Sequence, residues 1–173
     1  LEAEASERDA EIPMGEGIAG TVAVLATLGL QVRAFQAADA GFVSRLGKDA
    51  FCEYSEEPGV STLWMAKHYR TFVATLDGRS VGVAIVHLKA HKMPELVAIA
   101  VAKSARGRGV GRRLLATAER MALLRGARSL RLHTADFNLA ALELFLNNGF
   151  RITRRYRRYY RNRFAACELV KEL

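Results

Sequence analysis

The residues best suited to bind a phosphate form one short segment, Arg106-Gly107-Arg108-Gly109-Val110-Gly111. The segment follows an apolar run, residues 96–101, and leads directly into residues 112–124, which have helical periodicity. A strand, a glycine-punctuated turn and a helix in this order point backbone N–H groups and the positive end of a helix at a phosphate. Glycine at 109 and 111 would let a ligand approach the backbone closely. A merely flexible turn is the alternative interpretation.

Two further side chains could take a proton from an attacking amine. Glu95 begins the apolar run before the glycine segment, and His133 lies near the end of a second apolar run, residues 130–134. A free imidazole has a pKa of about 6.5 and accepts a proton near neutral pH, so we favour His133 as the base. Each residue also has a purely structural interpretation. Glu95 could be a surface carboxylate at a strand end, and His133 a solvent-facing residue of an alternating strand.

Hydrophobic periodicity predicts the elements that position these residues. We expect strands over residues 30–35, 71–76, 80–88, 95–101, 130–134 and 165–170, with a hairpin turn at Asp77-Gly78. We expect helices over residues 40–50 with Asp39 as N-cap, over 112–124 ended by Gly126, and over 139–147 opened by Asn138. A further helix is expected to pack on the sheet through an aromatic cluster, Tyr54, Trp64, His68 and Tyr69.

Composition and charge indicate a single globular domain with an acidic extension. The chain has 173 residues and a net charge of +8, and residues 1–26 contain six acidic side chains and one arginine. That leaves +13 on residues 27–173, which we predict to be the folded domain, with residues 1–26 as a flexible extension. The basic excess favours an anionic ligand, an acidic protein partner or adhesion to nucleic acid.

Two further features bear on compartment and chemistry. The longest apolar run, residues 17–30, contains Gly and Thr and is shorter than a bilayer span, so we expect a cytoplasmic protein without a membrane partner. Cys52 and Cys167 have no metal-binding spacing, and we predict that both are buried as small apolar side chains.

Three motifs resemble those of a known family. An arginine, two further residues and then Gly-x-Gly behind an apolar strand, here Arg106, Gly109 and Gly111, resemble the pyrophosphate-binding motif of the GNAT superfamily of acyl-CoA-dependent N-acyltransferases. Downstream, Asn138, Ala141, Phe145 and Gly149-Phe150 resemble the family's second motif, in which Asn opens a helix and Gly-Phe closes it. Tyr159-Tyr160 resembles a tyrosine pair of the peptide N-terminal acetyltransferases, including the bacterial enzyme that acetylates a ribosomal protein.

The resemblance covers about residues 30–173 and implies a fold and a co-substrate. The implied fold is the GNAT fold, an α/β (α+β) architecture whose mixed, mostly antiparallel sheet of six to seven strands is flanked by about four helices. Its fourth and fifth strands, residues 95–101 and 130–134, splay apart to admit the pantetheine arm of acetyl-CoA. No metal is implied. The implied binding residues are Ile99, whose N–H meets the thioester carbonyl, and Val101, Arg106, Gly107, Arg108, Gly109, Val110, Gly111, Arg112, Asn138 and Phe145.

The resemblance also implies catalytic residues, with one departure from the family pattern. Glu95 lies where the histone acetyltransferases of this superfamily carry a catalytic glutamate, and His133 where peptide N-terminal acetyltransferases carry His or Glu. Seven residues after Asn138 the family usually has a tyrosine that donates a proton to the departing CoA thiolate, and here the residue is Phe145. Phenylalanine cannot donate a proton, so Tyr159 or Tyr160 becomes a candidate donor or a contact for the acceptor.

We therefore expect an acetyl-CoA-dependent N-acetyltransferase that acts on a primary amine, with a peptide or protein N-terminus as the favoured acceptor. One alternative is a small-molecule amine as acceptor. Another is a non-catalytic acyl-CoA-binding regulatory module. Residues 151–163 contain seven arginines and three tyrosines, and either form a solvated hairpin or rim the acceptor site. We expect no nucleic-acid partner, and either a monomer or a homodimer.

Overall fold

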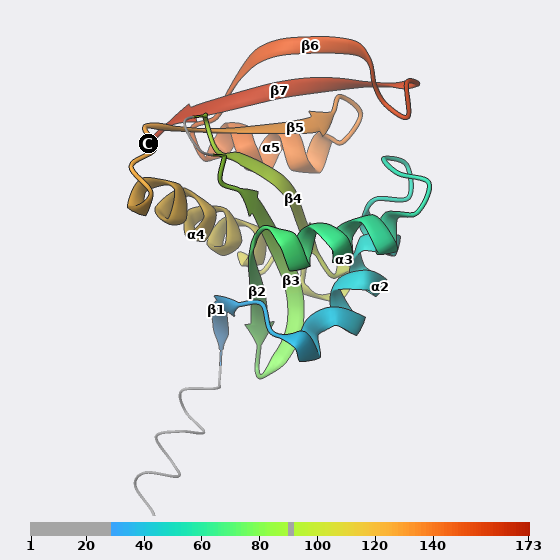
Figure 1. Cartoon of the computed structure of the whole chain (residues 1–173), viewed down its shortest axis with the longest axis vertical. Helices are drawn as coiled ribbons and strands as arrows, with labels where there is room; N and C mark the ends of the chain where they lie inside the picture. The colour runs from blue at the N-terminus through green and yellow to red at the C-terminus, as the bar shows by residue number, and fades with distance from the viewer. Residues whose placement is uncertain (1–28, 90–91) are drawn as a thin grey trace, which may run out of the picture.

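The computed structural model describes residues 29–89 and 92–173 (Figure 1). The predicted acidic extension, residues 1–26, lies outside these ranges. The helices are η1 (Ala37–Asp39), α2 (Ala40–Ala50), α3 (Pro58–His68), η2 (Lys103–Ala105), α4 (Val110–Leu124) and α5 (Leu139–Asn147). The strands are β1 (Leu30–Ala34), β2 (Arg70–Leu76), β3 (Arg79–His87), β4 (Glu95–Val101), β5 (Ser129–Ala135), β6 (Arg151–Tyr160) and β7 (Phe164–Glu172).

The seven strands form one sheet with the order β1-β2-β3-β4-β5-β7-β6. Every adjacent pair is antiparallel except β4 and β5, which run parallel. Residues of α4 and α5 pack on one face of the sheet with Phe72 and Leu132, and residues of α2 and α3 pack on the other face with Val83 and Ile85. The predicted fold, a mostly antiparallel sheet of six to seven strands flanked by about four helices, is confirmed.

The fourth and fifth strands separate soon after they meet. Only two residue pairs join them, Glu95 with Arg131 and Leu96 with Leu132. At the same place the register between β3 and β4 shifts, because Ile85 lies opposite Ala98 whereas Val86 lies opposite Leu96. Val97 is therefore the extra residue of a β-bulge, and a bulge bends the strand that contains it. The predicted splay between these strands is confirmed, and the bulge lies at the point where it begins.

Local sequence signals predicted several helix boundaries correctly. The Asn138 side chain accepts a hydrogen bond from the N–H of Ala141 at 3.2 Å, which caps α5 at the predicted residue. Gly126 follows the end of α4 with a φ of +75°, a conformation that favours glycine. Helix α2 begins after Asp39 as predicted, but the Asp39 carboxylate does not cap it. That carboxylate instead binds the guanidinium of Arg33 and the N–H of Gln36.

Two predictions about burial were wrong. Cys167 is buried as predicted, but Cys52, in the loop after α2, is exposed. Trp64 was expected to pack α3 on the sheet, yet 53% of its surface is exposed and its ring stacks on His68 on the same helix, with centroids 4.3 Å apart. In the described ranges, the structure contains no helix with the length and apolar character needed to cross a membrane.

Candidate active site

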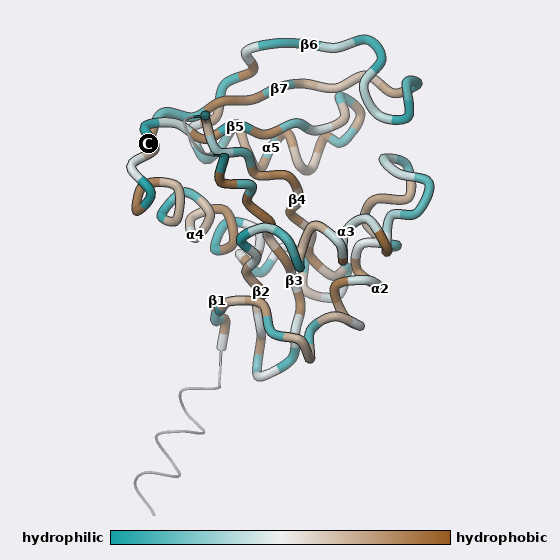
Figure 2. Tube along the Cα trace, viewed as in Figure 1, coloured by the Kyte–Doolittle hydropathy of each residue, from teal (hydrophilic) through white to brown (hydrophobic). Residues whose placement is uncertain are grey.

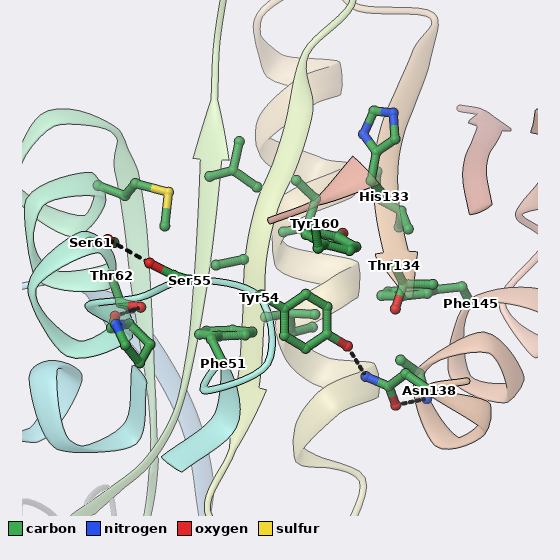
Figure 3. Close-up of a pocket in the computed structure, with 18 residues that line it drawn as sticks. Phe51, Tyr54, Ser55, Ser61, Thr62, His133, Thr134, Asn138, Phe145 and Tyr160 are labelled. Atoms are coloured by element: carbon green, nitrogen blue, oxygen red, sulfur yellow. Dashed lines mark hydrogen bonds between the residues drawn. The ribbon is translucent and has the colours of Figure 1, made fainter. Parts of the chain in front are cut away.

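A cavity of about 220 Å³ opens where β4 and β5 separate (Figure 3). Residues 96–99 of β4 and 132–134 of β5 line it, and the α2–α3 loop, α3, the start of α5 and the end of β6 complete its wall. A second cavity lies along the loop that precedes α4. The two cavities adjoin, because they share the lining residues Phe51, Ile99, Asn138, Ala141 and Phe145.

The loop before α4 has the shape of an anion-binding turn. Gly107 and Gly109 have φ angles of +72° and +78°, and a Cβ added at either glycine would meet no protein atom within 4 Å. The first N–H groups of an α-helix have no partner within that helix, and here the Arg113 N–H is the first to bond back, to the Gly109 carbonyl at 3.0 Å. Arg106 Nε donates to the Val101 carbonyl at 3.2 Å and ties the loop to the end of β4.

Gly111 lines the cavity along this loop and also has a packing role that the sequence did not reveal. A Cβ at Gly111 would lie 3.2 Å from Leu144 Cδ2 on α5. That distance is shorter than an ordinary van der Waals contact, so a side chain at this position would press on α5. Only Gly107 and Gly109 therefore leave room above the loop, while Gly111 lets α4 lie close to α5. Arg108, Val110 and Arg112 belong to the same loop and first turn, and Val110 is almost fully buried.

The β4 residues expected to contact the pantetheine arm lie beyond the end of strand pairing. Ile99 and Val101 follow the last β4–β5 pair, Leu96 with Leu132, so the β5 side of their strand has no paired neighbour. Ile99 lines both cavities, and Val101 lines the one along the glycine loop. Phe145 is 2% exposed, lines both cavities and packs against Phe150. The strand gap, the open glycines and the start of α4 together fit a long ligand with a phosphate group at one end.

Tyr54 reaches into the cavity from the α2–α3 loop. Its hydroxyl oxygen accepts a hydrogen bond from Asn138 Nδ2 at 2.8 Å (Figure 3). Its ring lies 4.5 Å from that of Tyr160, centroid to centroid and nearly perpendicular, and 5.9 Å from that of Phe51. Burial raises the pKa of the Tyr54 hydroxyl, and hydrogen bonds from Asn138 and Thr134 oppose that rise.

His133 lies between two carboxylates. Its Nδ1 is 3.0 Å from Glu95 Oε1, and its Nε2 is 3.4 Å from Glu168 Oε2. A neutral imidazole has one N–H and can donate to only one of these carboxylates at a time. His133 lines the cavity wall on β5, and its ring points away from Tyr54 and Asn138 (Figure 3). The ring therefore lies at the far side of the cavity from these two residues.

The Glu95 carboxylate interacts with three neighbouring side chains. Its hydrogen bond with His133 lowers its pKa to about 2, and Lys89 and Arg131, 3.1 and 3.3 Å from Oε2, act in the same direction. Glu95 is not among the residues that line the cavity. A carboxylate with so low a pKa holds a proton poorly, so Glu95 is suited to orienting His133 rather than to accepting the amine proton itself.

The two tyrosines of the predicted pair have different surroundings. Tyr160 lines the cavity, and burial, followed by Tyr54, raises its pKa well above the ordinary range. Tyr159 is 40% exposed and stacks on the His133 ring, with centroids 4.7 Å apart and planes 14° apart. Tyr160 therefore belongs to the cavity, whereas Tyr159 covers the imidazole from outside it.

The chain matches the acetyltransferase (GNAT) family over residues 38–150, which is well over half of its length. It belongs to the GNAT acetyltransferase family. The sequence-based assignment to this family, and with it to an acyltransferase enzyme, is thereby confirmed. Members of the family transfer acetyl groups from acetyl-CoA, and the strand gap and glycine loop fit that molecule. No curated protein sequence matches the chain significantly.

Solved structures with the same fold include several named acetyltransferases. Ard1 from Thermoplasma volcanium superposes with a TM-score of 0.73 at 21% identity, covering 84% of this chain and 99% of its own. The ribosomal-protein-S18-alanine N-acetyltransferase from Escherichia coli gives 0.70 at 24% identity, covering 83% and 93%. A GNAT family acetyltransferase from Elizabethkingia anophelis with acetyl-CoA bound gives 0.68 at 16%, covering 84% and 99%. At these identities the likeness establishes the fold.

Two residues of this GNAT site escaped the sequence analysis. Glu168 lies directly opposite His133 in the β5–β7 ladder, and only the strand register reveals that pairing. Tyr54 stood out only as one of several aromatic residues, although its hydroxyl reaches the start of α5, 84 positions further along the chain. A local pattern carries no signal for either contact.

Proposed function

We propose that this GNAT enzyme transfers the acetyl group of acetyl-CoA to the α-amino group of a peptide or protein. The proposal rests on one observation, which is that the α2–α3 loop and the end of β6 meet over the cavity. Tyr54 of the α2–α3 loop meets Tyr160 at the end of β6, and Glu56 of the same loop pairs with Arg161 in the β6–β7 turn at 3.7 Å. Because these contacts narrow the access to the cavity, an acceptor would reach it end first, which suits the terminus of an extended chain.

The cofactor would lie along the two adjoining cavities. The pyrophosphate would rest on the N–H groups of residues 107–112, with the positive end of α4 behind it. Arg106 would hold the loop in place through its bond to the Val101 carbonyl. The pantetheine arm would follow the unpaired side of β4 past Val101 to Ile99, whose N–H would meet the thioester carbonyl, with Asn138 and Phe145 on the opposite wall.

The amine proton would leave through water to His133. The ring points away from Tyr54 and Asn138, so a water molecule would carry the proton between amine and imidazole. The ring would lie between the carboxylates of Glu95 and Glu168, one near each of its nitrogens. Glu95 and Glu168 would orient the ring, and Tyr159 would hold it by stacking.

The free energy of deprotonation also favours an α-amine over a lysine side chain. At pH 7, reaching the neutral nucleophile costs roughly 1.2 kcal/mol for an α-amine with a pKa of about 7.7 to 8.0, and roughly 4.6 kcal/mol for an ε-amine with a pKa of about 10.4. A base that acts only through water is better matched to the less basic amine. Among proteins with this fold, one bears the name ribosomal-protein-S18-alanine N-acetyltransferase, and another is described as the NatC complex bound to Gag peptide and CoA.

Paired peptides test the proposal. One peptide of each pair has a free N-terminus and no lysine, and the other has a blocked N-terminus and one lysine. We expect the first to be acetylated with the higher kcat/KM, with a rate that rises from about pH 6 to about pH 8 as the α-amine loses its proton. Mass spectrometry of the products locates the acetyl group.

A small primary amine, assayed alongside by release of the CoA thiol, tests the competing acceptor class. Acetylation chiefly on lysine, or of the small amine alone, would reject the N-terminal assignment while leaving the acetyltransferase activity in place. Absence of transfer to every amine, together with tight acetyl-CoA binding, would favour the regulatory-module alternative.

A further inference from the structure

We propose that the Tyr54 hydroxyl donates the proton to the departing CoA sulfur, in place of the hydroxyl that Phe145 lacks. The inference rests on acetyl transfer from acetyl-CoA, the activity proposed above, but not on which amine is the acceptor. Tyr54 lies in the α2–α3 loop, far in sequence from the α5 motif, and lines the same cavity as Phe145. The hydroxyl thus reaches the site from the opposite wall.

The orientation of the Asn138 amide decides how the Tyr54 hydroxyl is used. Asn138 Oδ1 accepts the N–H of Ala141 as the cap of α5, so Nδ2 must be the atom that faces Tyr54. Nδ2 can only donate, which makes the Tyr54 oxygen the acceptor of this bond. The O–H proton of Tyr54 takes no part in the hydrogen bond from Asn138, so Tyr54 can donate it to a third group.

The surroundings of the Tyr54 oxygen suit a group that gives up a proton. Asn138 donates a hydrogen bond to this oxygen at 2.8 Å, and Asn138, Thr134 and Ala135 lower the pKa of the hydroxyl against the larger effect of burial. A donor directed at the oxygen stabilises the anion formed when its proton departs, as in an oxyanion hole. Burial keeps the pKa above its ordinary value, so the hydroxyl still carries its proton at neutral pH.

The other tyrosines near the cavity lack this combination. The Tyr160 hydroxyl has no hydrogen bond to any residue that the structure describes, and its strongly raised pKa comes from burial and from neighbouring tyrosines and Glu95. Tyr159 lies outside the cavity against His133. Of these three hydroxyls, only that of Tyr54 both lines the cavity and accepts a hydrogen bond that leaves its own proton free.

In the proposed step one C–N bond forms and one C–S bond breaks. The amine nitrogen attacks the thioester carbonyl carbon and forms the C–N bond, and the tetrahedral intermediate collapses with cleavage of the C–S bond. The electron pair of that bond stays on sulfur, which takes the Tyr54 proton to give the free thiol. The nitrogen loses its proton to the base, and Tyr54 regains one from solvent. Amine and acetyl-CoA thus become acetamide and CoA.

The test compares single and double variants with the best acceptor found in the amine panel above. Tyr54→Phe keeps the ring and removes only the hydroxyl, and should lower kcat by roughly 10²-fold, the lower end of general-acid contributions. The lower end applies because a thiol with a pKa of about 8.5 is already a fair leaving group. The double variant Tyr54→Phe/Phe145→Tyr restores a hydroxyl from the α5 side and should regain at least about tenfold in kcat.

Tyr69→Phe is the matched control, because this tyrosine stacks on His87 and does not line the cavity. It should leave kcat unchanged. A Tyr54→Phe enzyme that retains kcat within about twofold would overturn the inference, and so would a double variant no faster than the single one, since that result indicates a packing role. Higher activity in Tyr54→Phe would show instead that Tyr54 obstructs the site. Acceptor preference in the wild-type enzyme tests the N-terminal proposal separately.

Discussion

His133 is held more tightly than a solvent-facing strand residue would be. Carboxylates lie at both ring nitrogens, Tyr159 stacks on its face, and Arg131 lies 3.3 Å from Glu95 and 3.9 Å from Glu168. This arrangement fixes the ring and places compensating charge around it. An imidazole so positioned can receive a proton relayed from the cavity without moving.

Replacing His133 by alanine tests that role. We expect kcat to fall by roughly 10² to 10⁴, the usual contribution of a general base, because no other group would receive the amine proton. Acetyl-CoA affinity should change little, since the ring points away from Tyr54 and Asn138. His87→Ala, which removes a ring stacked on Tyr69, serves as the control in the same steady-state assay. A loss of less than about threefold for His133→Ala would mean that solvent accepts the proton.

The charge cluster also predicts how stability depends on pH. The folded state lowers the pKa of Glu95 from 4.5 to about 2. At about 1.36 kcal/mol per pKa unit, the ionised carboxylate contributes on the order of 3 kcal/mol to folding at neutral pH. The contribution is complete above the unfolded pKa and is lost as pH falls through the folded pKa. Stability should therefore fall between about pH 4.5 and pH 2.

Denaturant titrations of Glu95→Gln check this expectation. The variant should be less stable at neutral pH and should lose less stability than the wild-type protein over that acid range. Glu143→Gln, which changes an exposed carboxylate on α5, should keep the wild-type acid dependence. If Glu95→Gln and the wild-type protein lose stability in parallel, Glu95 is not the group responsible.

The glycine loop and α4 act together as one anion-binding element. The loop carries two glycines in the left-handed region and ends in a 15-residue helix whose apolar side, including Leu114 and Ala118, is buried against the sheet. Burial of that side fixes the direction of the helix and therefore the direction of its N-terminal N–H groups. The packing of Gly111 on Leu144 adds a second constraint from α5.

Matched glycine substitutions separate ligand binding from backbone strain. Gly109 and Gly78 both have a φ of +78° with open space where a Cβ would lie, but only Gly109 belongs to the proposed phosphate loop. Valine at either position should cost roughly 1–2 kcal/mol of stability through the left-handed conformation. Calorimetry should show weakened acetyl-CoA binding for Gly109→Val alone. Equal affinities in the two variants would refute the loop assignment.

Positive charge is concentrated on β6 and the turn that follows it, next to the cavity where the acceptor would bind. The arginines of residues 151–163 lie on β6 and its turn, at one edge of the sheet, and all seven are exposed. Figure 2 shows β6 as largely hydrophilic, in contrast to the more hydrophobic central strands β3 and β4. Because the end of β6 also lines the cavity through Tyr160, an acceptor bound there would pass next to this basic strand.

Acceptor peptides with acidic residues after the N-terminus should therefore have a lower KM than basic ones of equal length. The difference should shrink as salt is raised, since exposed charges are screened beyond about 10 Å at 0.1 M ionic strength. Arg157→Glu/Arg158→Glu should reverse the preference, whereas Arg125→Glu, at the far end of α4, should not. If the preference for acidic peptides changes neither with salt nor in the Arg157→Glu/Arg158→Glu variant, the β6 arginines do not select the acceptor.

Short stretches of the sequence by themselves determined several helix and strand bounds, one helix cap and the family motif. They predicted α5 to the residue, the bounds of β4, the capping by Asn138, the end of α4 before Gly126, and the strand-loop-helix unit with its family motif. These features depend on periodicity, capping and glycine conformation, which act over a few residues. The same local reasoning gave no sign that a Cβ at Gly111 would meet Leu144 on α5.

Only the tertiary structure decided which side chains meet. Glu168 faces His133 because of the β5–β7 register, and the His133 ring points away from Tyr54 and Asn138 because strand side chains alternate in direction. Tyr54 reaches Asn138 because the α2–α3 loop folds over the gap that the Val97 bulge helps to open. Such contacts depend on register, twist and loop path across the whole sheet, and no short stretch of the chain contains that information.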